Sequence, residues 1–207
     1  GGFSGGDEPD GSGKFIKAAF ENERVKEAVM ELLYKRDGLM LGICNGFQAL
    51  IKSGLLPYGR LGQVTKDSPT LFRNDINRHI SQIVTTRVGT ANSPWLSGFA
   101  VGDLHTIAVS HGEGKFVVNE DLAKELFANG QVAFQYVDPL EEEPTMESPY
   151  NPNGSYYAIE GIISRNGQIL GKMGHTERYE GNLFKNIIDE GLEQPLFDNA
   201  VAYFRGE

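Results

Sequence analysis

The stretch LMLGICNGFQAL, residues 39–50, contains the single cysteine of this 207-residue sequence, Cys44. The apolar run 39–43 predicts a buried strand, the segment 42–46 (GICNG) predicts a tight turn, and residues 47–53 predict a helix. Cys44 is therefore expected at an elbow between a strand and a helix. Glycines at positions 42 and 46 remove the Cβ atoms that such a turn would bring into collision.

An elbow of this kind holds the cysteine side chain above the edge of the sheet. Because the free N–H groups and the dipole of a helix N-terminus favour an anion, we expect the pKa of the Cys44 thiol to fall below its usual value of roughly 8.5. The resulting thiolate is a nucleophile. A small buried cysteine without a chemical role is the alternative, and the flanking glycines argue against it because such a residue does not need them.

The composition is that of a globular domain, with 40% apolar and 23% charged residues, and the length suits one domain with a sizeable core. The formal net charge is −9 and the basic residues are scattered, which argues against nucleic acid or an anionic membrane as a partner. The sequence contains no apolar run of roughly 18 residues and no signal peptide. Since one cysteine cannot form an internal disulfide, we expect a cytoplasmic location.

Helical and strand patterns alternate along the chain. Asn22 caps a predicted helix that ends before Gly38 and leads directly into the Cys44 strand. Further strands are predicted at 81–88, 106–110, 116–118 and 132–137, helices at 119–129, 183–190 and 195–204, and a hairpin at 158–173 that turns at Asn166-Gly167. This order predicts a three-layer α/β fold with an open, mostly parallel sheet and helices on both faces.

A cysteine nucleophile needs a base, and the base needs an orienting partner. Among the four histidines, His175 follows a predicted strand, and Glu177 comes two residues later. Residues two apart in an extended chain point to the same side, so Glu177 can reach the ring nitrogen that His175 does not direct at Cys44. Cys44, His175 and Glu177 form a candidate triad. His79 is expected at the surface and His105 in a structural role.

Two other interpretations stay open at this point. The pairs His111-x-Glu113 and His175-x-Glu177 could converge on a divalent metal and make the protein a metal-dependent hydrolase, although this leaves Cys44 without a role and matches no standard zinc spacing. The chain could also be a partner-binding domain of the same fold without catalytic activity.

Five segments together resemble one family. GICNGFQ (42–48) and the pair His175-x-Glu177 resemble the motifs of class I glutamine amidotransferases; GGFSGGDE (1–8), SHGEGKF (110–116) and NPNGS (151–155) narrow the resemblance to the glutaminase domain of phosphoribosylformylglycinamidine synthase. The resemblance covers essentially the whole chain and implies a flavodoxin-like fold. Many members have proline on both sides of the histidine, where this chain has Gly174 and Thr176.

The resemblance implies the hydrolysis of L-glutamine to glutamate and ammonia, with Cys44 as nucleophile, His175 as proton carrier and Glu177 as its orienting partner. It further implies an oxyanion hole made by the backbone N–H groups of Gly2 and Asn45. Substrate contacts are expected from four residues, namely Gln48, His111, Gly112 and Gly114. No metal is expected at this site.

The resemblance also implies a partner. In the family, the ammonia passes to a synthetase domain or subunit that uses ATP and Mg²⁺ to make formylglycinamidine ribonucleotide in purine biosynthesis. We therefore expect no cofactor in this domain itself. We also expect residues 1–207 to form one glutamine amidotransferase domain, the C-terminal part of a longer synthetase, that lacks the strands with which the family's domain begins.

Overall fold

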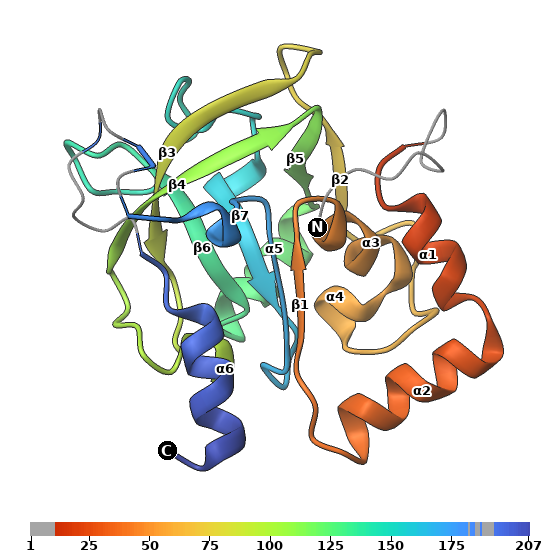
Figure 1. Ribbon diagram of the computed structural model, residues 1–207. Coiled ribbons are helices and arrows are strands. Elements are labelled where there is room, and N and C mark those ends of the chain that lie inside the picture. The colour runs from red at the N-terminus through yellow and green to blue at the C-terminus, as the bar shows by residue number, and fades with distance from the viewer. Residues whose placement is uncertain (1–10, 182, 185–186, 188–192) are drawn as a thin grey trace.

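The computed structural model describes residues 11–181, 183–184, 187 and 193–207. A six-stranded sheet in the order β1-β8-β7-β6-β3-β4 forms its centre (Figure 1). The strands are β1 (Met40–Ile43), β3 (Ile80–Val88), β4 (Leu104–His111), β6 (Val132–Val137), β7 (Ile159–Ile163) and β8 (Ile169–Lys172). A second, two-stranded antiparallel sheet pairs β2 (Thr70–Arg73) with β5 (Glu113–Val117).

The predicted α/β class is confirmed, but the expectation of mostly parallel pairing is wrong for the described strands. Only β1 and β8 run parallel there, and the pairs β3–β4, β3–β6, β6–β7 and β7–β8 are antiparallel. A parallel pair needs a long crossover connection, whereas β7 and β8 are joined by the predicted tight turn at Asn166-Gly167, with Gly167 at φ 75°. The hairpin thus forces the antiparallel direction.

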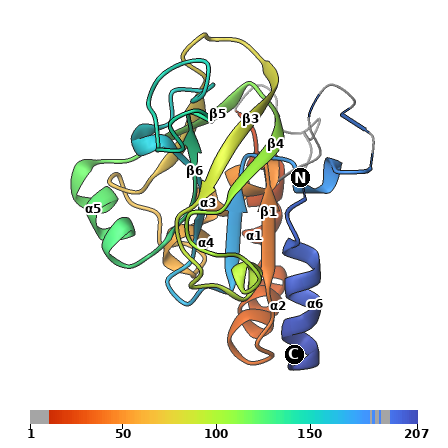
Figure 2. The same cartoon turned by 90° about the vertical axis from the view of Figure 1, so that its left-hand side faces the viewer.

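Helices lie on both faces of the sheet, as predicted (Figure 2). One face is covered by α2 (Glu23–Tyr34), α3 (Asn45–Ser53), α4 (Leu55–Tyr58) and α5 (Glu120–Ala128), whose buried side chains share one apolar cluster with Ile43, Ile162 and Ile169. The other face carries α6 (Leu196–Arg205), where Leu196 packs with Trp95 and Leu170. Successive residues Ile169 and Leu170 of β8 therefore enter opposite cores, as the period of two in a strand requires.

The contact of α3 with the sheet fixes the position of Cys44. Phe47 is fully buried, and its ring packs against Gly171 of β8, where a Cβ would lie 2.2 Å from the ring. Phe47 also stacks on Phe116, with 6.3 Å between the ring centroids. Truncating such a buried ring to alanine costs about 3–5 kcal/mol in general, so this packing holds the start of α3 firmly against the strand.

Most predicted elements are confirmed within one or two residues. The Asn22 side chain accepts hydrogen bonds from the N–H groups of Arg24 and Val25 and caps α2 as expected. The sequence patterns missed the short helix α1 (Lys14–Phe20), α4 and β2, and the predicted helix at 183–190 lies largely outside the described residues. In the part of the chain that the structure describes, none of the helices is long and apolar enough to cross a membrane.

Candidate active site

Cys44 occupies the predicted elbow between β1 and α3. Its backbone has φ 53° and ψ −108°, a conformation that is strained for a residue with a side chain. A Cβ on Gly42 would lie 2.8 Å from the backbone of Gly46, so the two glycines touch across the turn. The N–H group of Cys44 donates to the carbonyl of Lys172 at 2.8 Å, which ties the elbow to β8. Strain held at one residue in this way is typical of a functional position.

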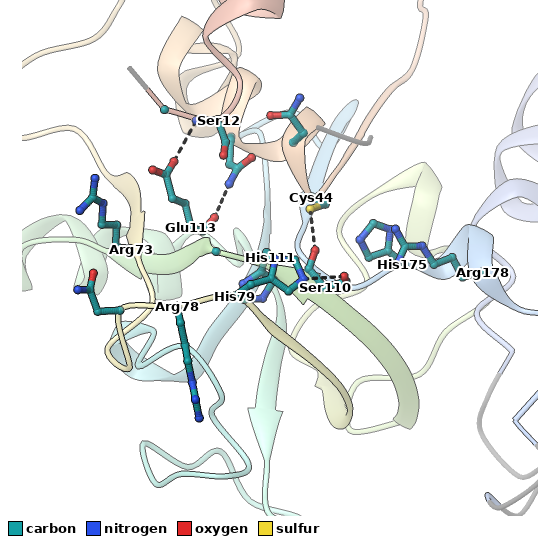
Figure 3. A pocket seen from close by; sticks show the side chains of 15 residues that line it. Ser12, Cys44, Arg73, Arg78, His79, Ser110, His111, Glu113, His175 and Arg178 are labelled. Atoms are coloured by element: carbon teal, nitrogen blue, oxygen red, sulfur yellow. Dashed lines mark hydrogen bonds between the residues drawn. The ribbon is translucent and has the colours of Figure 1, made fainter. Parts of the chain in front are cut away.

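His175 follows β8 and reaches the same place from the other side of the elbow. Its N–H group donates to the carbonyl of Ala108 at 2.8 Å, and its Nδ1 donates to Oε1 of Glu177 at 2.6 Å. The carboxylate therefore fixes the proton on Nδ1 and leaves Nε2 on the side of Cys44 (Figure 3). This Nε2 atom is buried and lacks a conventional hydrogen-bond partner among the described residues.

Electrostatics reinforce this arrangement. Burial lowers the pKa of His175, but contacts with Cys44 and with Glu177 outweigh it and raise the pKa from 6.5 to about 9. Burial raises the pKa of Glu177, but the hydrogen bond from His175 outweighs it and lowers that pKa below its usual value. The histidine is therefore largely protonated at neutral pH and paired with an ionised carboxylate.

A cavity of about 620 Å³ opens beside these residues (Figure 3). Cys44 and His175 lie in its wall, and the Cys44 sulfur lies 3.6 Å from the carbonyl oxygen of Ser110. The remaining wall comes from the segment before α1, the start of α3, the end of β2 with the β2–β3 connection, the end of β4, the start of β5 and the turn after His175. Its residues are Gly11, Ser12, Asn45, Gln48, Arg73, Asn77, Arg78, His79, Ser110, His111, Gly112, Glu113 and Arg178.

His111 is held as a neutral ring in this wall. It is 3% exposed, and its Nδ1 donates to Oδ1 of Asn74 at 3.1 Å, while Nε2 is buried with no hydrogen-bond partner among the described residues. Burial, together with the charges of His79 and His175, lowers the pKa of His111 from 6.5 to about 4. A neutral ring with a bare Nε2 is a hydrogen-bond acceptor for a ligand.

The structure brings most of the predicted substrate residues to the cavity. Gln48 and Gly112 line it together with His111, and the side-chain amide of Gln48 donates to the backbone carbonyl of Glu113. Gly114 does not line it; this glycine lies behind the His111 ring, where a Cβ would be 2.4 Å from Cε1 of that ring. In this position Gly114 supports the His111 ring, and its expected contact with substrate stays a prediction.

The expected oxyanion hole consists of the backbone N–H groups of Asn45 and Gly2. Asn45 is the first residue of α3 and lines the cavity, so its backbone N–H group lies at the N-terminus of that helix. Gly2 lies outside the described residues.

Several polar residues that the sequence did not predict lie at the cavity mouth. Arg73, Arg78 and Arg178 are exposed there, and His79, which we expected only at the surface, also lines the cavity, with its Nε2 3.1 Å from Oγ of Ser110. The end of β2 and the β2–β3 connection, which carry Arg73, Arg78 and His79, have no periodic pattern, so nothing in the sequence pointed to them. Ser110 belongs to the SHGEGKF segment (110–116), so the sequence did contain a signal for this residue. His105 stacks edge-on against Phe99 at 5.0 Å, as its expected structural role requires.

The two His-x-Glu pairs do not converge as a metal site would require. The Glu113 carboxylate accepts a hydrogen bond from the N–H group of Ser12 at 3.0 Å, and Glu177 is bound to His175. Within residues 11–181 and the described remainder, no three His, Cys, Asp or Glu side chains are grouped as metal ligands. The geometry therefore gives no support to the metal-dependent alternative.

Comparison with known proteins agrees with the site. Residues 1–204 match the family of CobB/CobQ-like glutamine amidotransferase domains. The phosphoribosylformylglycinamidine synthase subunit PurQ of Methanococcus maripaludis is 32% identical over 99% of this chain and 78% of its own length, and that of Gloeobacter violaceus is 37% identical over 81% of this chain and 66% of its own length. The chain thus belongs to the glutamine amidotransferase domain family and, within it, to the PurQ subunits of phosphoribosylformylglycinamidine synthase.

The fold comparison leads to the same family. A chain in the PurLQS structure from Thermotoga maritima superimposes with a TM-score of 0.68 and 25% identity, over 99% of this chain and 77% of that chain. The matches to several curated relatives, among them the PurQ subunits of Gloeobacter violaceus and Acaryochloris marina, span 66% and 54% of those proteins. This chain therefore corresponds to somewhat more than half the length of such relatives.

Proposed function

We propose that this chain hydrolyses L-glutamine to glutamate and ammonia through Cys44, His175 and Glu177. The observation that carries the proposal is that a strained cysteine elbow and a buried histidine line one cavity of about 620 Å³, while the Glu177 carboxylate lies 2.6 Å from that histidine. Nucleophile, proton carrier and orienting group are the three parts that covalent amide hydrolysis requires.

The first half of the reaction forms a thioester. The Cys44 sulfur attacks the carboxamide carbon of glutamine, and the C=O electron pair moves to oxygen to give a tetrahedral oxyanion. Because the pKa of His175 is about 9, the imidazolium holds the proton that the departing nitrogen needs. The C–N bond breaks, ammonia leaves with that proton, and a glutamyl thioester remains on Cys44.

The second half restores the enzyme. Neutral His175 takes a proton from water, the hydroxide adds to the thioester carbon, and the C–S bond breaks to release glutamate and regenerate the sulfur nucleophile. Glu177 keeps Nδ1 protonated throughout, so that Nε2 always faces the reacting atoms. The loss of this orienting contact alone should therefore slow both halves.

The cavity wall offers groups for the rest of the substrate. The N–H group of Asn45 at the start of α3, together with that of Gly2, is proposed to stabilise the oxyanion; one such donor is worth on the order of a hundredfold or more in turnover. The Oε1 atom of Gln48 and Nε2 of His111 are buried acceptors without a partner among the described residues, and they suit the amino group of glutamine.

The ammonia is proposed to serve a synthetase. The relatives are subunits of phosphoribosylformylglycinamidine synthase, and the fold matches a chain of PurLQS. We infer that the product passes to a partner domain or subunit that uses ATP and Mg²⁺ to make formylglycinamidine ribonucleotide in purine biosynthesis, in the cytoplasm. On this proposal, residues 1–207 act as the ammonia-producing domain of a longer or multi-subunit enzyme and hold no cofactor themselves.

Active-site labelling tests the glutaminase proposal directly. The full chain is treated with a glutamine analogue that carries an electrophile in place of the amide, and the labelled residue is identified by mass spectrometry. We expect one label on Cys44, suppressed by excess glutamine and absent in Cys44→Ser, while Cys44→Ala abolishes ammonia release without changing the circular dichroism spectrum. A cysteine that reacts only after unfolding, or full turnover in Cys44→Ala, would contradict the proposal.

A further inference from the structure

A buried ammonium group lies beneath the segment that carries His175. Lys172, the last residue of β8, is completely buried, and so is Glu160 of β7, whose Oε1 lies 4.0 Å from the lysine Nζ. Lysine and glutamate are almost never buried unless each is compensated, because removing a charge from water is costly. A fully buried pair at this position therefore calls for an explanation.

The surroundings of Lys172 satisfy all three of its protons. The Nζ atom donates to the carbonyl of Gly174 at 3.3 Å, to Oγ1 of Thr176 at 3.0 Å and to Oε1 of Gln194 at 2.7 Å, and it also lies 5.0 Å from the centroid of the Phe134 ring. Burial lowers the pKa of Lys172 below its usual value, and the attraction of Glu160 and Glu177 opposes this shift without cancelling it. The pocket is thus built around an ammonium ion.

These contacts fall on both sides of His175. Lys172 holds the carbonyl of Gly174 before it and the hydroxyl of Thr176 after it, and the Thr176 hydroxyl donates onward to Gln194 at 2.7 Å. The N–H group of Gly174, on the same side of the histidine, donates to the Glu160 carboxylate. The two residues next to the histidine are therefore fixed by the two buried charges.

The need for such fixing follows from Gly174. A Cβ at this position would lie 2.9 Å from Oε1 of Glu160, so the close approach of the carboxylate requires glycine. Glycine leaves the backbone free to adopt many conformations, and His175 must meet both Cys44 and Glu177. A displacement of the ring by 1 Å is enough to cost about a hundredfold in rate at a site of this type.

We propose that the Lys172–Glu160 pair positions the His175 ring, by holding Gly174 and Thr176 on either side of it through hydrogen bonds from one buried ammonium and to one buried carboxylate. Lys172 and Glu160 are positioning residues that act through the histidine. The inference deepens the proposed glutaminase function and rests on it for its kinetic consequences, whereas the geometry of the histidine is measurable without any turnover.

Lys172→Met tests the proposal first, in the full chain. Methionine fills similar volume but donates no hydrogen bonds, so we expect kcat for glutamine hydrolysis to fall roughly 10–100-fold while KM changes less than about twofold. The matched control is Gln131→Met, which also removes buried donors, here to the carbonyls of Pro57 and Ile163 outside the cavity. We expect Gln131→Met to lower Tm and leave kcat unchanged.

The double variant Lys172→Met/Glu160→Gln separates positioning from charge balance. Removing both charges leaves no uncompensated buried ion, and glutamine at position 160 still offers an oxygen to the N–H group of Gly174. We expect the double variant to recover most of the Tm lost in Lys172→Met without recovering kcat. Recovery of kcat together with Tm would overturn the proposal, because the pair would then act only through stability.

The titration of His175, followed by NMR of its ring protons, gives a readout that does not depend on activity. The charged and titratable groups that act on the ring are Cys44, His111, Glu177 and Arg178, and the double variant keeps all of them. It removes Lys172, which interacts with Glu177, together with the opposite charge of Glu160, so the net charge equals that of the wild type. If the ring loses its contacts with Cys44 and Glu177, we expect the midpoint of the His175 titration to fall from about 9 toward 6.5. An unchanged midpoint together with an unchanged kcat would refute the positioning role.

A third variant covers the case in which the Lys172 variants do not fold. Thr176→Val keeps the shape of the side chain and removes the hydroxyl that links Lys172 to Gln194, and we expect a several-fold loss of kcat and a smaller downward shift of the His175 midpoint. If the wild type hydrolyses no glutamine, the proposed function fails, and the His175 titration alone then decides whether the pair positions the ring.

Discussion

Nδ1 of His175 lies 2.6 Å from Oε1 of Glu177, two residues further along the chain. This short contact gives the histidine its tautomer and much of its raised pKa, next to the larger contribution from Cys44. Two residues so close in the sequence can meet without any long-range contact. The orientation of the His175 ring toward Cys44, in contrast, depends on the tertiary structure.

Glu177→Gln should lower kcat for glutamine by roughly 10²–10⁴-fold, because the amide no longer fixes Nε2 toward Cys44 and no longer balances the imidazolium. Steady-state ammonia release with the purified chain measures this effect. Alkylation of Cys44 should remain possible in the variant, which shows that the nucleophile is still present. An unchanged rate would mean that another group orients His175.

Low pH should destabilise the protein through His111. Its pKa is about 4 in the folded state and 6.5 when unfolded, so its stabilising contribution is present above pH 6.5 and is lost as pH falls from 6.5 through 4. The full loss is on the order of 3 kcal/mol. Thermal unfolding of wild type and His111→Phe across this range should show a steeper decline in the wild type; parallel curves would contradict the burial of a neutral ring.

Gly114→Ala should disturb substrate binding from behind the cavity wall. The new Cβ would lie 2.4 Å from Cε1 of His111, so the ring must move, and we expect a loss of about 1–3 kcal/mol in the free energy of unfolding and a raised KM for glutamine. Gly112→Ala is the control for stability, since its Cβ meets nothing within 4 Å. Equal unfolding free energies for the two variants would refute the supporting role of Gly114.

Chelation should leave glutamine hydrolysis unchanged. The proposed chemistry uses a sulfur nucleophile and a histidine, and the Glu113 carboxylate is engaged with the backbone of Ser12. Turnover is measured before and after dialysis against EDTA, with iodoacetamide treatment as the comparison that should abolish it. A loss of activity that zinc restores would favour the metal-dependent hydrolase instead.

Local features were readable from the sequence because short-range physics determines them. The glycines beside Cys44 predict an elbow whatever surrounds it, Asn22 predicts a helix start, and Asn166-Gly167 predicts a tight turn. The strand directions were misjudged for the opposite reason. Helix and strand periodicities mark what an element is, but the pairing direction depends on which strands meet and on how long their connections are.

The sequence by itself predicted the Cys44 elbow, the His175–Glu177 pair and the α/β class, since each depends on residues close together in the chain. Only the tertiary structure decided that burial keeps His111 neutral beside Asn74, that Gly114 packs behind that ring, and that Lys172 and Glu160 hold both neighbours of His175. These contacts join residues from different elements, and burial sets their strength, so no local pattern could predict them.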